Sequence, residues 1–311
     1  MIKSPQIHYV AFTGSVVGGE AIEKSASGLF KGIGLELGKK ILPIFVQMQT
    51  SLFSSLYEAC CIKHDHSTEN LRMVIGLLQC DHVADDLNDI NGDYQDMFSK
   101  LIHDQDDSVE VNIFDLTADK FPQDLAACDG YIISGSQFSA YDDIAWIHKA
   151  KSLVRDLFNA KIPTIGICFG HQLIAESLGG KVEKEENKGW GVGVQHWEMK
   201  SKNDWMGDKP LENLSLLASH QDQVVDLPEN SKLIASSNFC PIAGFQTGSM
   251  LTLQGHPEFS RDYNKALISK RIERIGQETV DTAIESLSEN IDSHTVGRWM
   301  VEFIRLNKQQ L

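Results

Sequence analysis

Residues 163–172 read PTIGICFGHQ, and they are the most informative part of the sequence about the fold. Its first half is apolar and predicts a buried strand over Pro163–Cys168. The chain then continues into Gly170–Leu178, whose apolar residues have helical spacing and which Gly179-Gly180 ends. A buried strand that passes directly into a helix is the repeating unit of a parallel α/β sheet.

The same alternation extends on both sides of this stretch. Apolar runs predict strands at 73–78, 109–116 and 130–134, and helical spacing predicts helices at 94–102 and 143–159. Farther along the chain, a small β-meander is expected over 232–237, 243–246 and 250–254, and closing helices over 260–277 and 292–306. We therefore expect an α/β fold, with a mostly parallel sheet that carries helices on both faces.

Cys168 lies where the predicted strand becomes a helix, between Gly166 and Gly170. This Gly-x-Cys-x-Gly pattern is typical of a nucleophile elbow, because the flanking glycines allow a tight turn that a side chain would obstruct. The turn places the sulfur at a helix N-terminus, which stabilises a thiolate. The N–H of Phe169 would then point into an oxyanion hole. A buried packing cysteine is the alternative, but it does not require the two glycines.

A second motif, LQGHPEF at 253–259, contains His256 and Glu258 two residues apart. Residues i and i+2 of an extended chain point to the same side, so the carboxylate can lie beside the imidazole. Such a carboxylate fixes the tautomer of the histidine and stabilises its protonated form. By itself His-x-Glu also suits an exposed ion pair, but with the elbow it completes a Cys–His–Glu triad.

A third motif, ISGSQFS at 133–139, follows an apolar strand. A loop of small residues at the carboxyl end of a strand can present backbone N–H groups to an anion. The loop alone indicates no function, and it gains one only from the other two motifs.

The composition excludes several classes of protein. The chain has 311 residues and a net charge of −15, and no basic stripe is visible, which argues against nucleic-acid binding. The apolar stretch 41–57 is interrupted by Gln47 and Gln49, so no membrane span is expected. Six cysteines without a CxxC pair, and no signal peptide, favour a cytoplasmic protein with reduced thiols.

Together the three motifs resemble the class I, triad-type glutamine amidotransferase domain, over residues 72–311. The resemblance is to the amidotransferase half of GMP synthase and to γ-glutamyl peptidases, and it implies a flavodoxin-like fold. It also implies that Cys168 attacks the γ-carbonyl of a glutamyl group and forms a thioester, with His256 as the base and Glu258 as its orienting carboxylate. The oxyanion hole would comprise Gly135, Ser136 and the N–H of Phe169.

The resemblance also implies a substrate-binding set, namely Gln172, Trp190, Gly191, Ser219 and His220. One departure concerns the oxyanion loop, which often reads Gly-Gly-Pro in the family and here reads Gly135-Ser136-Gln137. With one glycine fewer, the loop conformation is expected to differ.

Residues 1–71 differ from the rest of the chain. They contain six lysines, six acidic residues and no arginine, so the whole net charge belongs to 72–311 and a boundary is expected near residue 71. Within residues 9–40, the motifs around Gly14 and Glu36 resemble a fragment of an aldehyde dehydrogenase. We expect a poorly ordered, non-functional remnant, or a chance helical extension.

The expected activity is cysteine-dependent hydrolysis of the γ-glutamyl amide bond of glutamine or of a γ-glutamyl compound. Thioester chemistry requires no metal or organic cofactor, so none is expected. One alternative is a glutaminase subunit that delivers ammonia to a separate synthetase, because no synthetase motif is visible in this chain. Another is a catalytically silent binding module, although such a module would not need all three triad residues.

Overall fold

The computed structural model describes residues 72–207 and 211–308, together with the short strands 9–14, 32–37 and 40–41. The chain divides into two compact units, Met1–Asn70 and Leu71–Leu311. In the first unit, β1 (Tyr9–Gly14) pairs in parallel with β2 (Gly32–Leu37), which pairs antiparallel with β3 (Lys40–Ile41). Most of the segment that resembles an aldehyde dehydrogenase lies outside the described residues.

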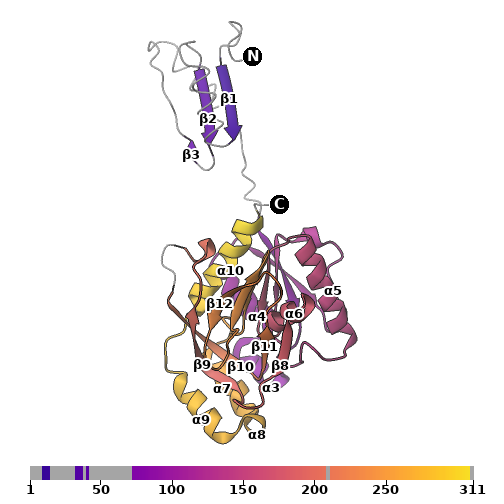
Figure 1. Ribbon diagram of the computed structural model, residues 1–311, viewed down its shortest axis with the longest axis vertical. Coiled ribbons are helices and arrows are strands. Elements are labelled where there is room, and N and C mark those ends of the chain that lie inside the picture. The colour runs from indigo at the N-terminus through magenta and orange to yellow at the C-terminus, as the bar shows by residue number, and fades with distance from the viewer. Residues whose placement is uncertain (1–8, 15–31, 38–39, 42–71, 208–210, 309–311) are drawn as a thin grey trace. The chain divides into compact units, whose positions relative to one another are not determined.

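The second unit is built on a nine-stranded sheet (Figure 1). Its parallel part consists of β4 (Val74–Gln79), β5 (Glu110–Asp115), β6 (Gly130–Ile133), β7 (Thr164–Ile167) and β14 (Met250–Leu253). These strands lie in the order β5-β4-β6-β7-β14, with parallel pairing throughout. This is a flavodoxin-like order, which places a ligand-binding crevice at the carboxyl ends of β4 and β6. The predicted α/β fold is therefore confirmed.

The expected β-meander continues the same sheet. Antiparallel strands extend it from β14 in the order β13 (Gly244–Thr247), β12 (Lys232–Ser236), β9 (Gly191–Met199) and β10 (Asn213–His220). A separate two-stranded sheet pairs β8 (Lys181–Lys184) with β11 (Asp222–Asp226). The sequence patterns predict none of the four strands between residues 181 and 226.

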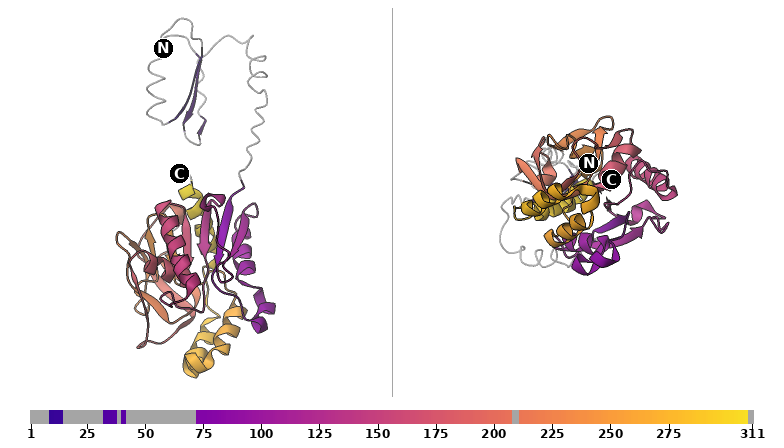
Figure 2. Two further views of the ribbon diagram at one scale, coloured as in Figure 1. Left: turned by 90° about the vertical axis from the view of Figure 1, so that its right-hand side faces the viewer. Right: turned by 90° about the horizontal axis from the view of Figure 1, so that it is seen from below.

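Helices cover both faces of the sheet (Figures 1 and 2). On one face, α5 (Ala145–Asn159) and α6 (Phe169–Ser177) bury their apolar sides in a shared core. On the other face, α4 (Tyr94–His103) and α10 (Ser293–Lys308) contribute to a second core. Short elements complete the unit: α3 (Asp85–Asn91) and the 3₁₀ turns η1 (Leu125–Ala127) and η2 (Asp204–Met206).

The helix expected over 260–277 is interrupted. The structure has α7 (Arg261–Lys270), α8 (Ile272–Ile275) and α9 (Gln277–Ser286) instead. Arg271 separates the first two helices, and Gly276 separates the next two with a φ of 94°, which a glycine adopts without strain. Because of these breaks, the chain folds back beside the sheet instead of continuing straight.

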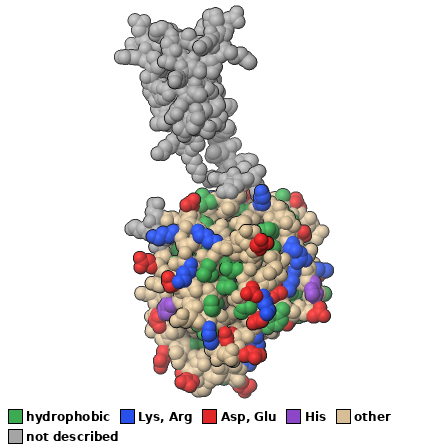
Figure 3. Space-filling model, in the orientation of Figure 1, with side chains coloured by type: hydrophobic (Ala, Val, Ile, Leu, Met, Phe, Trp, Pro, Cys, Tyr) green, Lys and Arg blue, Asp and Glu red, His purple; other side chains and the backbone are tan. Residues whose placement is uncertain are grey.

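None of the helices in the described ranges is long and apolar enough to cross a membrane. On the face shown in Figure 3, lysine and arginine side chains are interspersed with aspartate and glutamate and do not form a stripe.

Candidate active site

Cys168 occupies the turn between β7 and α6, as a nucleophile elbow requires. Its φ of 53° and ψ of −101° are unusual for a residue with a side chain. The turn is held by a hydrogen bond of 2.9 Å from the N–H of Cys168 to the carbonyl of Leu253 in β14. Because α6 begins at Phe169, the first N–H groups of this helix have no partner within the helix and lie next to the sulfur.

The two flanking glycines are needed for the steric reason expected, because a side chain at either position would obstruct the turn. Neither Gly166 nor Gly170 has a positive φ, and Cys168 itself takes the strained conformation. A Cβ on Gly166 would lie 2.5 Å from the carbonyl oxygen of Gly170, and a Cβ on Gly170 would overlap the carbonyl of Ile133. The glycines therefore allow α6 to pack closely on β6 and β7, which is what holds the turn in place.

His256 and Glu258 form a buried pair beside this turn. The Nδ1 atom of His256 lies 2.7 Å from Oε1 of Glu258, and the two side chains are 3% and 0% exposed. The imidazole also stacks on the ring of Phe259, with 3.9 Å between centroids and 6° between planes. The ring is thus held from one edge and one face.

The surroundings favour the protonated form of His256. Burial alone would lower its pKa, but the charges of Glu258 and Cys168, with hydrogen bonds to both, raise the pKa of His256 to about 10. His220, which lies in the same region, behaves in the opposite way, because burial lowers its pKa to about 4. The surroundings therefore favour the charged form of His256 and the neutral form of His220.

The loop after β6 reaches the same point. A Cβ on Gly135 would lie 2.8 Å from Cε1 of His256, so only glycine lets the loop backbone pack against the ring. Ser136 donates from Oγ to the carbonyl of Cys80 at 2.9 Å. Gln137 donates its backbone N–H to Asp81 at 2.7 Å and its side-chain amide to the same carboxylate at 3.0 Å. These hydrogen bonds hold Ser136 and Gln137 in place, at the two positions where the family often has a glycine and a proline.

A pocket of about 270 Å³ opens over Cys168. Four of the five expected substrate-binding residues line it: Gln172, Trp190, Ser219 and His220. The fifth, Gly191, is buried at the start of β9 and is not among the lining residues.

The side chain of Gln172 has fewer free groups than a substrate ligand would offer. Its Nε2 donates to the backbone carbonyl of Asp222 at 2.8 Å and to Oε1 of Gln254 at 3.2 Å. Both N–H groups of the amide are therefore used within the protein, and its oxygen remains for a substrate.

Several residues in or next to the site did not follow from the sequence. Gln254 donates from its side-chain amide to the sulfur of Cys168 at 3.4 Å. It precedes His256 by two residues, so the same alternation that places Glu258 beside His256 could have indicated that Gln254 points into the site. Arg271 and Arg274 line the pocket from the interrupted helix, for which no motif gave a signal. Asp81 belongs to an acidic stretch whose sequence suits either a site mouth or a solvated helix start, and the structure places it against the oxyanion loop.

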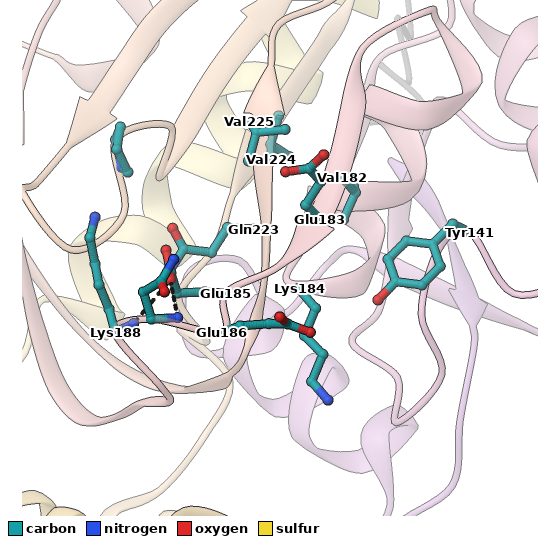
Figure 4. A pocket seen from close by; sticks show the side chains of 12 residues that line it. Tyr141, Val182, Glu183, Lys184, Glu185, Glu186, Lys188, Gln223, Val224 and Val225 are labelled. Atoms are coloured by element: carbon teal, nitrogen blue, oxygen red, sulfur yellow. Dashed lines mark hydrogen bonds between the residues drawn. The ribbon is translucent and has the colours of Figure 1, made fainter.

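A second and larger cavity of about 670 Å³ adjoins this pocket, because Tyr141 and Lys184 line both. Figure 4 shows Tyr141 on the far side of this cavity from Lys188, with Gln223 and Glu185 between them. The loop at 185–188 is closed by Glu185, whose carboxylate accepts from the N–H groups of Asn187 and Lys188. The space beyond the active-site pocket is thus lined by charged and polar groups together with apolar side chains, namely Val182, Val224, Val225 and Pro241.

Comparison with known proteins agrees with this geometry. The family model described as "Glutamine amidotransferase class-I" matches residues 92–274. γ-Glutamyl peptidase 4 of Arabidopsis thaliana is 34% identical over 178 residues, which cover 55% of this chain and 70% of the relative. A glutamine-hydrolysing GMP synthase of Aromatoleum aromaticum is 29% identical over 241 residues, which cover 67% of this chain and 44% of the synthase.

Solved structures show the same fold. A glutamine amidotransferase from Thermotoga maritima superimposes with a TM-score of 0.60 at 18% identity, covering 77% of this chain and 99% of its own. Because the family model covers more than half of the chain, the chain belongs to the class I glutamine amidotransferase family. The resemblance of residues 9–40 to an aldehyde dehydrogenase is not supported by these comparisons.

Proposed function

We propose that this protein hydrolyses the γ-glutamyl amide bond of γ-glutamyl compounds, with Cys168, His256 and Glu258 as its catalytic triad. The observation that carries the proposal is a strained cysteine at a helix N-terminus beside a buried histidine–glutamate pair, in which the pKa of the histidine is raised. This arrangement suits a thiolate–imidazolium pair. In such a pair the sulfur of Cys168 is already deprotonated when it attacks an amide carbonyl.

The reaction follows from the groups present. The thiolate of Cys168 attacks the γ-carbonyl carbon, and N–H groups of Phe169 and of the Gly135–Ser136 loop stabilise the resulting oxyanion. The C–N bond then breaks as His256 gives its proton to the leaving amine. Neutral His256 next takes a proton from water, which attacks the thioester, releases glutamate and regenerates the thiolate. Glu258 holds the imidazole and stabilises its charged form throughout.

The relatives favour a peptide leaving group over ammonia. Identity to γ-glutamyl peptidase 4 is 34%, compared with 29% to the GMP synthase. The adjoining cavity of about 670 Å³ provides room for a leaving group larger than ammonia. We also propose a cytoplasmic location, which suits the free thiols of the four cysteines that the structure describes.

The test uses purified protein with glutamine, glutathione and a panel of γ-glutamyl dipeptides. Free ammonia, glutamate and the released amine are quantified for the wild type, for Cys168→Ala and for Cys128→Ala. Cys128 is a buried cysteine outside the pocket, so Cys128→Ala controls for loss of a thiol. We expect rapid cleavage of a dipeptide that only Cys168→Ala abolishes. Slow ammonia release from glutamine alone would indicate instead a subunit that supplies a synthetase.

A further inference from the structure

Two arginines form one side of the active-site pocket. Arg271 lies at the break between α7 and α8, and Arg274 lies within α8. Both line the pocket that contains Cys168. Their guanidinium carbons lie 6.0 Å and 5.2 Å from the ring centroid of Trp190, and Nη1 of Arg271 donates to Oγ of Ser219 at 2.9 Å.

Neither guanidinium is neutralised within the described part of the chain. No carboxylate there lies within ion-pair distance of Arg271 or Arg274, whereas Arg305 pairs with Asp106 at 2.7 Å. A guanidinium cannot lose its proton in a protein, so both charges persist. In a chain with a net charge of −15, two unpaired cations beside a nucleophile form a local site for an anion.

Acidic side chains also line this pocket. Ser139 donates its N–H to Asp142 at 2.9 Å and its hydroxyl to Asp222 at 2.5 Å, and both aspartates line the pocket. The pocket lining therefore carries both negative and positive side chains. A molecule that carries both an ammonium and a carboxylate matches this distribution, and every γ-glutamyl compound carries both.

We propose that Arg271 and Arg274 bind a carboxylate of the substrate, which deepens the function proposed above and rests on it. A guanidinium recognises a carboxylate through two parallel N–H···O bonds. Stacking on Trp190 orients the guanidinium groups and leaves N–H groups at their edges available. The carboxylate has two sources in such a substrate, namely the α-carbon of the glutamyl group and the C-terminus of the leaving peptide.

Three substrates distinguish these sources: γ-glutamylglycine, γ-glutamylglycinamide, and γ-glutamylglycine with its α-carboxylate amidated. Each is assayed with the wild type, Arg271→Met and Arg274→Met, and with Arg298→Met, an exposed arginine of α10 outside the pocket. For γ-glutamylglycine we expect the pocket variants to raise KM by about tenfold or more, the usual effect of losing a charge-assisted hydrogen bond, while kcat changes little. If the arginine substitutions no longer raise KM for one of the two amidated substrates, the carboxylate that this substrate lacks is the one that the arginines bind.

A binding measurement separates this proposal from the proposed reaction. Calorimetric titration of γ-glutamylglycine into Cys168→Ala, with and without each arginine substitution, requires no turnover. We expect weaker binding in both double variants and partial recovery with Arg271→Lys. Lysine keeps the positive charge but cannot form two parallel hydrogen bonds to a carboxylate. Because Arg274 is exposed, Arg274→Met is expected to fold normally even if Arg271→Met does not. KM and Kd values equal to those of Arg298→Met would overturn the proposal.

Discussion

The carboxylate of Asp81 accepts two hydrogen bonds from Gln137, one from its backbone N–H at 2.7 Å and one from its side-chain amide at 3.0 Å. Asp81 follows β4 and Gln137 follows β6, so the contact joins the two strands at which the order of the sheet reverses. Gly135 and Ser136 lie just before Gln137 on the same loop. Asp81 therefore acts as a positioning residue for the backbone that faces the sulfur.

The substitution Asp81→Asn tests this role. The side-chain amide of the new asparagine has only one oxygen, and its NH₂ group would face an N–H donor of Gln137. One of the two hydrogen bonds from Gln137 is therefore lost, and the loop that contains Gly135 and Ser136 is held less firmly. Since removal of a whole oxyanion donor costs about 10²–10³ in kcat, we expect Asp81→Asn to lower kcat by about tenfold with little change in KM. Asp89→Asn, on an exposed side of α3, is the control. A wild-type kcat in Asp81→Asn would refute the role.

The pH dependence of activity tests the pairing of His256 with Glu258. Protonated His256 must supply a proton to the leaving amine, so activity should persist into alkaline solution and fall as pH passes the His256 pKa of about 10. Glu258→Gln removes the charge that raises this pKa, so the alkaline limit should move to lower pH.

Measurement of kcat against pH for the two proteins checks the direction of this shift. Glu289→Gln is the matched control, because Glu289 pairs with His196 at 2.8 Å on the surface. The raised pKa of His256 also makes the stability of the fold depend on pH. The contribution of protonated His256 to folding is fully present below its ordinary pKa of 6.5 and is lost as pH rises through about 10. An alkaline limit that Glu258→Gln leaves unmoved would contradict the assignment.

A single methyl group at Gly135 should displace His256. Its Cβ would lie 2.8 Å from Cε1 of the ring, so the ring or the loop must move by several tenths of an ångström. Because small displacements of catalytic groups can cost about 10²-fold, we expect Gly135→Ala to lose at least that much kcat. Thermal unfolding should show a folded protein. Retention of full activity would mean that the loop does not pack on His256 in solution.

The parts of this site that the sequence predicted are those encoded locally. The Gly-x-Cys-x-Gly turn depends on neighbouring residues, and the pairing of His256 with Glu258 depends on alternation along one extended segment. The same alternation also brings Gln254 to the sulfur, a contact that the sequence motifs did not single out. Where spacing within a single segment decides the geometry, reasoning from the sequence suffices.

The remaining features depend on contacts between distant segments. Asp81 meets Gln137 only because β4 and β6 are neighbours in the sheet, and Arg271 reaches Ser219 only because the expected helix over 260–277 is interrupted. The antiparallel strands between 181 and 226 are held mainly by pairing with one another, which short apolar runs do not reveal. Tertiary contacts of this kind leave no local pattern.

Detection of the thioester on Cys168 would test the proposed mechanism at its first covalent step. The protein is mixed with γ-glutamylglycine, quenched in acid during turnover and digested, and the peptides are examined by mass spectrometry. We predict a glutamyl group on the peptide that contains Cys168, which is absent from Cys168→Ala and accumulates when the hydrolysis of the thioester is slowed. Turnover without that adduct, or turnover that survives in Cys168→Ala, would contradict the proposed mechanism.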